Sequence, residues 1–240
     1  MGFILHGVVN GYDDFYYLER EMMKRIVLIS GGLDSTALLY KSRKDLGAEN
    51  VVGLFFNYGQ KSYKQEIRAV AQLTGGIEVV VKDITDLFSD SRSSLIDETL
   101  PITKMVKGFD GYEFVSERTE VEFRNGVFIS CAISLAMQLY PTESVEIAYG
   151  ATKMREPYID CTDAFVSQFD GLSSLISGER IRVIAPFLEK GKDEVWEIAK
   201  ECGVPIFATW SCYDGGDSPC GRCPACLDRK ILEARDANHN

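Results

Sequence analysis

A glycine-rich turn between an apolar strand and a helix limits the fold of this chain more than any other feature. Residues 25–30 read as a short buried strand rich in isoleucine, valine and leucine. The turn SGGLDST follows over residues 30–36, and the next stretch, to about Leu46, has the pattern of a helix. Glycine lets the backbone turn sharply and approach a ligand closely, and the N-terminus of a helix attracts anions. The turn therefore predicts a phosphate-binding loop.

The composition of this turn favours one kind of phosphate chemistry over another. It has no lysine and no Gly-Lys-Ser/Thr ending, so it is not the Walker P-loop and is poorly built for transfer of a γ-phosphoryl group. Its hydroxyl groups add donors for a phosphate. Asp34 is a candidate for an indirect contact to magnesium, or for the N-cap of its own helix. The residues predicted to bind the phosphates are Ser30, Gly31, Gly32, Leu33, Asp34, Ser35 and Thr36.

Strands and helices alternate along most of the chain. Apolar runs predict strands at residues 25–30, 51–56, 77–81, 145–149 and 181–185. Helical patterns cover residues 35–46, 63–74, 124–139, 165–176 and 193–202, and a last helix begins near Pro224. This alternation predicts an α/β fold in which helices cover both faces of a parallel sheet. Residues 83–122 are irregular and long for a connection, which is typical of a functional lid or a disordered segment.

The charge of the chain narrows the range of partners. A net charge of -10 argues against a primary role in binding nucleic acid, because phosphate contacts require a basic surface. No apolar run is long enough to span a membrane, and the first residues lack the pattern of a signal peptide. We therefore expect a cytoplasmic protein, in which clustered cysteines bind a metal or take part in catalysis rather than form disulfides.

Four of the seven cysteines cluster near the C-terminus, at Cys212, Cys220, Cys223 and Cys226. Two Cys-x2-Cys steps with a shared middle residue, and a fourth cysteine a short loop away, suit a tetrahedral site with four thiolate ligands. Because no position remains for water, the expected zinc ion is structural; an iron–sulfur cluster is the alternative. The predicted divisions are an N-terminal extension (1–24), an α/β domain (25–205) and a zinc-binding C-terminal region (206–240).

The glycine turn resembles the pyrophosphate loop of the ATP pyrophosphatase superfamily, and other motifs resemble one family within it, the 7-cyano-7-deazaguanine synthases. The resemblance runs from about Arg25 to Ala234 and implies a Rossmann-like fold of the adenine nucleotide alpha hydrolase type for the α/β domain. The segments that carry it are Phe56 to Lys61 (a Tyr-Gly-Gln motif after the second strand), Phe123 to Asn125 (an Arg-Asn helix start), Gly150, Pro186, Lys192, and Thr209 to Arg229 with the four cysteines.

The resemblance implies a substrate and a reaction. In that family ATP adenylates the carboxylate of 7-carboxy-7-deazaguanine, ammonia displaces AMP to give the amide, and a second ATP activates the amide oxygen on the way to the nitrile. The implied cofactors are ATP, Mg²⁺ and Zn²⁺, and the product feeds queuosine-type modification of transfer RNA. The implied catalytic residues are Ser30, Asp34, Ser35, Arg124 and Lys192. The implied substrate contacts are Tyr58, Gln60, Arg124, Asn125, Gly150 and Asp160.

Asp160 would read the guanine-like edge of the substrate, although its residue type also suits a helix N-cap. Around it the sequence departs from the family. Residues 154–162 read MREPYIDCT, where the family has Asp-Tyr-Ser-Gly-Tyr-Pro-Asp-Cys-Arg, so Thr162 replaces an arginine. Asn57 likewise replaces an aspartate before the Tyr-Gly-Gln motif.

These departures leave alternatives for the amine that attacks the activated acid. Relatives in bacterial antiviral operons pass the activated deazaguanine acid to the N-terminal amine of a protein and stop at the amide. Outside the family, the alternatives are a ligase that thiolates or amidates transfer RNA and a zinc-ribbon interaction module without catalysis. The family commonly forms homodimers, so we expect a homodimer here.

Overall fold

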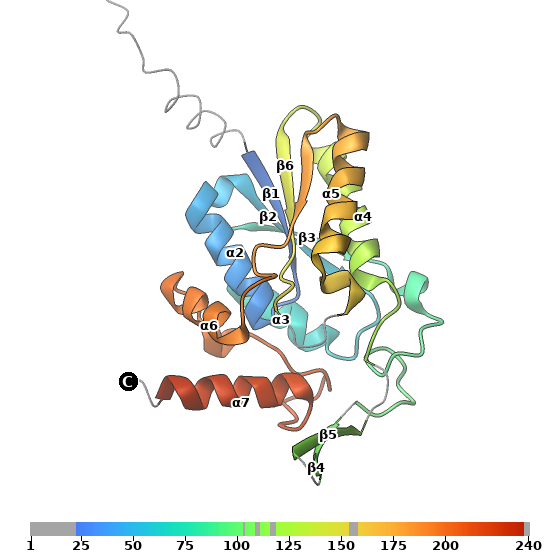
Figure 1. Ribbon diagram of the computed structural model, residues 1–240, viewed down its shortest axis with the longest axis vertical. Helices are drawn as coiled ribbons and strands as arrows, with labels where there is room; N and C mark the ends of the chain where they lie inside the picture. Colours follow the sequence, from blue (N-terminus) through green and yellow to red (C-terminus); the bar gives the residue numbers. More distant parts are fainter. Residues whose placement is uncertain (1–22, 103, 109–110, 116–118, 154–157, 238–240) are drawn as a thin grey trace, which may run out of the picture.

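A parallel five-stranded sheet forms the centre of the molecule in the computed structural model (Figure 1). The structure describes residues 23–102, 104–108, 111–115, 119–153 and 158–237. The strands lie in the order β3-β2-β1-β6-β7, and each pairs in parallel with its neighbours. Their bounds are β1 Met23–Ile29, β2 Val51–Asn57, β3 Glu78–Asp83, β6 Ser144–Ala148 and β7 Ile181–Ile184.

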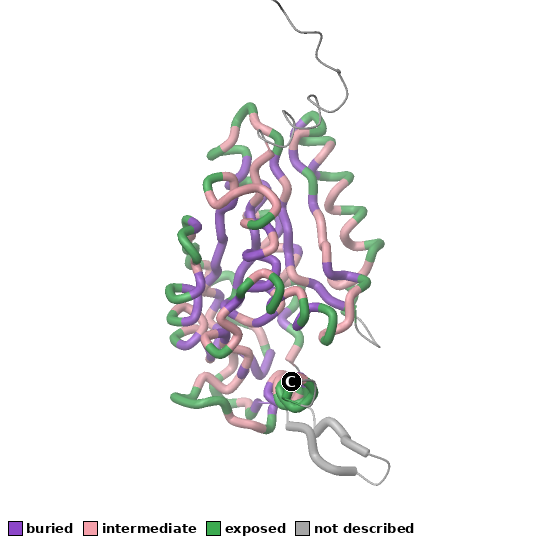
Figure 2. Tube along the Cα trace, turned by 90° about the vertical axis from the view of Figure 1, so that its left-hand side faces the viewer, coloured by how far each residue is buried: buried purple, intermediate pink, exposed green. Residues whose placement is uncertain are grey.

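Helices cover both faces of this sheet, which confirms the predicted α/β fold. On one face α2 (Leu33–Leu46), α3 (Tyr63–Leu73) and α6 (Lys192–Glu201) pack against one hydrophobic cluster. On the other face α4 (Arg124–Leu139) and α5 (Asp163–Ser177) pack against a second cluster. Buried residues follow the strands, and exposed residues follow the outer sides of the helices (Figure 2). The central strand β1 is buried over its last four residues, as expected for a strand with helices on both sides.

The strand order places a crevice beside β1. From β1 the chain adds β2 and β3 on one side and then returns to add β6 and β7 on the other side. At such a reversal the connections after neighbouring strands diverge, and ligands bind beyond the carboxyl ends of the strands. The glycine turn follows β1 at this point. The segment after β6 comes close to it, because a Cβ on Gly150 would lie 3.2 Å from the backbone nitrogen of Ser35.

The C-terminal region closes this end of the molecule. Helix α7 (Pro224–Ala237) lies across the carboxyl ends of the strands (Figure 1). The backbone N–H of Trp210 donates a hydrogen bond of 2.8 Å to the carbonyl oxygen of Gly31 in the glycine turn. Arg229 on α7 donates to the Thr209 hydroxyl and to the Ile206 carbonyl, at 2.6 and 2.8 Å. The region is therefore fastened to the sheet domain at the predicted phosphate site.

A second close approach fastens the cysteine-bearing loop. Gly215 has a φ of 67°, a conformation that favours glycine. A Cβ at this position would lie 2.1 Å from the carbonyl oxygen of Lys61, in the connection between β2 and α3. The loop therefore lies directly on this connection, and only glycine fits at the point of contact.

Two expectations differ from the structure. Residues 83–122, expected to be irregular, contain a short 3-10 helix, η2 (Thr85–Phe88), and an antiparallel hairpin of β4 (Lys104–Gly108) and β5 (Gly111–Val115); a role as a functional lid stays a prediction. Strand β1 begins at Met23, two residues before the predicted start; the rest of the predicted N-terminal extension lies outside the described residues. Among the helices that the structure describes, none has the length and apolar character needed to cross a membrane.

The contact at Gly215 makes a prediction about stability. Gly215→Ala should lower the free energy of unfolding by about 2 kcal/mol, because it adds left-handed backbone strain and a steric clash with Lys61. Urea unfolding followed by tryptophan fluorescence measures this change. Gly216→Ala is the matched control, since a Cβ there would meet only the Ser218 carbonyl oxygen, at 3.6 Å. Equal unfolding curves for the two variants would contradict the proposed contact.

Candidate active site and cysteine cluster

The glycine turn folds around its own hydroxyl groups. Gly31 has a φ of 75°, and a Cβ there would lie 2.9 Å from the carbonyl oxygen of Glu66 on α3. The N–H of Ser30 donates to the Ser35 hydroxyl at 3.1 Å, and the N–H of Gly32 donates to the Ser30 hydroxyl at 3.3 Å. Ser30 is exposed, so its hydroxyl borders the solvent-facing side of the turn and can donate to a phosphate there. Ser35 is buried, and its hydroxyl also donates to the Gly32 carbonyl at 3.2 Å.

The other residues of the turn support it from inside. Leu33 is buried in the core, so only its backbone is available to a ligand. Thr36 is also buried, and its N–H donates to the Gly32 carbonyl at 3.0 Å. Helix α2 begins at Leu33, and Gly32 holds the N-cap position without a side-chain cap. The free N–H groups of the first helical turn therefore remain open to an anion.

Asp34 forms an ion pair with Lys192, the first residue of α6. The alternative role of Asp34 as the N-cap of α2 is wrong, because Gly32 occupies that position and Asp34 is the second helical residue. Its Oδ1 atom is buried without a hydrogen-bond partner in the described part of the chain. An unpartnered buried carboxylate oxygen is costly unless a ligand, water or cation completes it. The Asp34 carboxylate therefore fits an indirect partner for magnesium.

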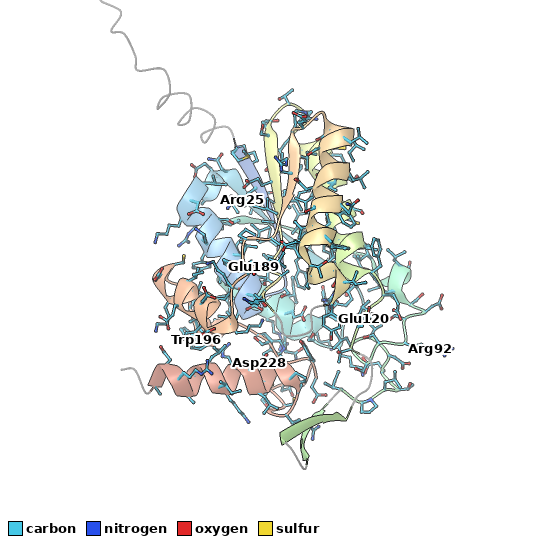
Figure 3. All side chains as sticks on the ribbon, viewed as in Figure 1. Arg25, Arg92, Glu120, Glu189, Trp196 and Asp228 are labelled. Carbon is cyan, nitrogen blue, oxygen red and sulfur yellow. The ribbon has the colours of Figure 1, made fainter. Side chains whose placement is uncertain are left out.

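Asp228 adds a second carboxylate that the sequence did not indicate. It lies on α7, and Trp196 lies on the neighbouring helix α6 (Figure 3). Asp228 is exposed, yet partial desolvation raises its pKa; Lys192 opposes this increase, and Asp34 adds to it. Asp228 therefore interacts electrostatically with the same lysine that pairs with Asp34. Only the folded chain brings α7 to this place, so no local sequence pattern could have identified Asp228.

Arg124 is the centre of a second group of residues, at the start of α4. Its Nη1 donates to the Tyr58 hydroxyl at 3.2 Å, and its guanidinium lies 5.5 Å from the centre of the Tyr58 ring. Its Nε is buried without a hydrogen-bond partner in the described residues. Phe123, just before it, has a φ of 52°, which is strained for a non-glycine residue. Arg124 therefore has an unused donor for an acceptor such as a carboxylate or a carbonyl group.

Asp160 and Tyr213 lie near Arg124. Asp160 belongs to the 3-10 helix η3 (Ile159–Cys161), and both residues interact electrostatically with Arg124. The N-cap alternative for Asp160 is wrong, because Thr162 caps α5 by accepting a hydrogen bond of 3.3 Å from the Phe165 N–H. Burial raises the pKa of Tyr213, so its phenol stays protonated and can donate a hydrogen bond. Tyr213 reaches Arg124 only through tertiary packing, so no local sequence pattern identified it as a site residue.

Cys161 interacts with cations of both groups of site residues, Lys192 beside the glycine turn and Arg124 at the start of α4. Its thiol donates to Asp160 at 3.7 Å, and burial raises its pKa to about 12 against the opposing effects of Arg124 and Lys192. Both cations therefore lie near this thiol, and the predicted phosphate and substrate residues share one region. A thiol with this pKa is neutral at physiological pH and is a poor nucleophile.

Gln60 organises the segment after β2. Its Nε2 donates to the Phe56 carbonyl at 3.0 Å and to the Glu66 carboxylate at 2.9 Å, and its Oε1 accepts from the Tyr58 N–H at 2.9 Å. The protein itself therefore supplies hydrogen-bond partners for both ends of the buried Gln60 amide, and this amide holds the Tyr58 backbone in position. Glu66 also accepts a hydrogen bond of 2.6 Å from the Ser62 hydroxyl. The two remaining predicted substrate contacts lie nearby in the fold: Asn125 follows Arg124 in the first turn of α4, and Gly150 follows β6.

The four predicted cysteines come together in one cluster. Their sulfur atoms all lie within 4.8 Å of one another. A tetrahedral zinc ion with bonds of about 2.3 Å requires sulfur atoms about 3.8 Å apart, and Cys220 and Cys226 are separated by 3.9 Å. Backbone N–H groups of Asp214 and Cys220 donate to the Cys212 sulfur, at 3.4 and 3.3 Å. These donors stabilise thiolate charge, so the cluster fits a zinc ion.

The buried carboxylate of Glu66 predicts a pH dependence of stability. Burial raises its pKa above the ordinary value of 4.5. As pH rises through 4.5 and then through the folded-state pKa, the unfolded chain loses its proton first, and the stability contributed by the protonated carboxyl is lost. Relative to Glu66→Gln, the wild-type free energy of unfolding should fall as the pH rises from 4.5 towards neutral. Urea unfolding of both proteins across this range measures the difference, and parallel curves would exclude the effect.

The cysteine cluster makes a prediction about metal content. The purified protein should hold about one zinc ion per chain, and Cys223→Ser should lose it and unfold at a lower temperature. Cys131→Ser, on α4 and outside the cluster, is the control and should keep the metal. Elemental analysis with thermal unfolding tests both variants. Bound iron with visible absorption would instead show an iron–sulfur cluster.

Comparison with known proteins shows to which family this chain belongs. The family model for queuosine biosynthesis protein QueC matches residues 24–233. A 7-cyano-7-deazaguanine synthase from a Nitratiruptor species is 31% identical over 210 residues, which cover 85% of this chain and 90% of that protein. The enzyme of that name from Aquifex aeolicus is 33% identical, over 85% of this chain and 94% of that protein. One from Leptospira biflexa is 33% identical, over 92% of this chain and 94% of that protein. This chain belongs to the QueC family.

Proposed function

We propose that this chain is an ATP-dependent ligase that adenylates the carboxylate of 7-carboxy-7-deazaguanine and passes the activated acyl group to ammonia. One observation carries the proposal: the segment after β6 joins the glycine turn to the substrate group, because Gly150 lies against Ser35 and the Tyr149 hydroxyl donates to the Asp160 carbonyl at 3.0 Å. The relatives' name, 7-cyano-7-deazaguanine synthase, agrees with a site that holds a nucleotide and a purine-like acid side by side.

The glycine turn would bind the phosphates of ATP. The open N–H groups at the start of α2 and the hydroxyls of Ser30 and Ser35 suit the β- and γ-phosphates, which leave as pyrophosphate. The positive charge of Lys192 would stabilise negative charge that develops at the α-phosphate. Asp34 and Asp228 would hold magnesium through its water ligands, because Mg²⁺ binds a few carboxylates and keeps several waters.

The group around Arg124 would bind the deazaguanine acid. The unpartnered Nε of Arg124 suits an oxygen of the acid or of its adenylate. Asp160 would accept hydrogen bonds from the N–H groups of the guanine-like edge. The protonated phenols of Tyr58, which is buried, and Tyr213, which is half-buried, would donate to ring acceptors.

The reaction then balances in two ATP-dependent stages. A carboxylate oxygen attacks the α-phosphorus and pyrophosphate leaves; ammonia attacks the acyl carbon and AMP leaves, with one proton released, to give the amide. In the second stage the amide oxygen attacks the α-phosphorus of another ATP and pyrophosphate leaves. Loss of AMP and the remaining N–H protons gives the nitrile. Both stages require attack at the α-phosphorus of ATP, which agrees with a glycine turn that lacks the P-loop lysine.

A protein amine in place of ammonia is the second candidate, and one observation favours it. Thr162, where the family has arginine, caps α5 and contributes no charge to the site. Tyr158 and Ile159, beside Asp160, are 45% and 82% exposed, so an apolar rim borders the proposed substrate residues. Such a rim suits a polypeptide acceptor, whose attack would end at the amide.

Incubation with ATP, magnesium and 7-carboxy-7-deazaguanine, with and without ammonium, separates these outcomes by mass spectrometry. We expect AMP and the nitrile when ammonium is present. Adenylate or amide without nitrile would support the protein-amine alternative. No AMP with any acid would contradict both candidates.

The ion pair at the glycine turn predicts a loss of activity. Lys192→Met should lower the rate of AMP formation by about 100-fold, because it removes a positive charge beside the reacting phosphate. Lys190→Met is the matched control: Lys190 lies two residues earlier and pairs at 3.9 Å with Glu194 in the first turn of α6. Equal rates for wild type and Lys192→Met, with both variants folded, would remove Lys192 from the mechanism.

A further inference from the structure

The 3-10 helix η3, which carries Asp160, is a short turn at the surface. Ile159 is 82% exposed, and Asp160 and Cys161 are half-buried. Two of the hydrogen bonds in this segment are local. The Cys161 N–H donates to the Tyr158 carbonyl at 2.8 Å, and the Thr162 hydroxyl donates to the Ile159 carbonyl at 2.8 Å. Local bonds shape a short turn but do not fix its place in the fold, so the placement of Asp160 depends on contacts from other segments.

A buried tyrosine supplies such a contact. Tyr149 follows β6 directly, and its ring is buried in the hydrophobic cluster on the α4 side of the sheet. Its hydroxyl donates to the Asp160 carbonyl at 3.0 Å. Burial raises the pKa of Tyr149, so the phenol is protonated at neutral pH and keeps its donor. Because packing fixes the ring, the hydroxyl holds the Asp160 backbone at a defined place.

The backbone of the same segment is fixed to the glycine turn. A Cβ on Gly150 would lie 3.2 Å from the Ser35 nitrogen and 3.3 Å from the Asp34 carbonyl carbon, so the two segments are in close contact. The Tyr149 N–H donates to the Ile184 carbonyl, at the end of β7, at 3.2 Å. Tyr149 therefore has a fixed position relative to the proposed phosphate site, and its hydroxyl extends this order to η3.

We propose that Tyr149 is a positioning residue for substrate recognition, whose hydroxyl holds η3 so that the Asp160 carboxylate faces the guanine-like edge of the acid. This inference rests on the proposed function. The Asp160 carboxylate keeps acceptors for this role, because the hydrogen bond that it receives in the described part of the chain comes from the Cys161 thiol, a weak donor, at 3.7 Å. Tyr149 acts through Asp160 and not by direct contact with the substrate.

Tyr149→Phe tests this role, because it keeps the ring and removes only the hydroxyl. The dissociation constant for 7-carboxy-7-deazaguanine should rise by about tenfold, while that for α,β-methylene-ATP should stay the same. Isothermal titration calorimetry with magnesium and this ATP analogue measures binding of the acid without reaction. Tyr140→Phe is the matched control. Tyr140 caps the C-terminus of α4, before the start of β6, so this variant should bind the acid like wild type.

A double-mutant cycle separates positioning from a merely structural effect. Asp160→Ala should raise the dissociation constant for the acid by about 100-fold. Adding Tyr149→Phe should raise it no further, because no carboxylate remains to be positioned. A combined effect of about 1,000-fold would show that Tyr149 acts independently of Asp160 and would overturn the inference. Equal binding by Tyr149→Phe and wild type would overturn it as well. A wild-type protein that does not bind the acid would overturn the proposed function and this inference together.

Hydrogen–deuterium exchange gives a readout that needs neither ATP nor the acid. The Cys161 N–H should exchange faster in Tyr149→Phe than in wild type, because η3 loses its contact with the core. Exchange in α4 should not change. Mass spectrometry of peptides that cover residues 158–162 and 124–139 measures both. Unchanged exchange at Cys161 would overturn the positioning role and leave the proposed function standing.

Discussion

The contact at Gly31 connects the parts of this molecule that matter for its chemistry. Its α-carbon lies against α3, where a side chain would meet the Glu66 carbonyl at 2.9 Å, and its own carbonyl accepts from Trp210 at 2.8 Å. The turn is thus held on one side by α3 and on the other by the C-terminal region. Any residue other than glycine would separate the turn from α3. The proposed phosphate site therefore depends on a backbone that carries no side chain.

From this contact, hydrogen bonds lead to the group around Arg124 on one side and to the cysteine cluster on the other. On one side Glu66 binds Gln60, Gln60 binds the Tyr58 backbone, and the Tyr58 hydroxyl accepts from Arg124. On the other side Trp210 donates through its indole N–H to the Cys212 carbonyl at 2.8 Å, at the first cysteine of the cluster. The cysteine cluster thereby fixes the segment that contacts the turn, although the cluster itself takes no part in the proposed reaction. Hydrogen-bond donors that are already held in place need not rearrange when negative charge develops in a transition state.

Local sequence patterns predicted the features that depend on neighbouring residues. The glycine turn, the alternation of strands and helices, and the cysteine spacing each lie within short segments, and the structure confirms the fold and the cluster. The roles of the substrate contacts remain predictions. Glu66, Asp228 and Tyr213 were missed because each reaches the site through tertiary packing. The capping alternatives for Asp34 and Asp160 were wrong because Gly32 caps one helix and Thr162 caps the other. The hairpin of β4 and β5 was missed because each strand has only five residues.

Acid-dependent exchange of labelled pyrophosphate into ATP tests, without any amine, whether this site forms an acyl adenylate. Adenylation is reversible while the adenylate stays bound, so we expect label to enter ATP only when 7-carboxy-7-deazaguanine and magnesium are present. Lack of exchange with the acid, or release of ADP and phosphate in its place, would exclude acyl-adenylate formation, because the chemistry would then occur at the γ-phosphorus or not at all.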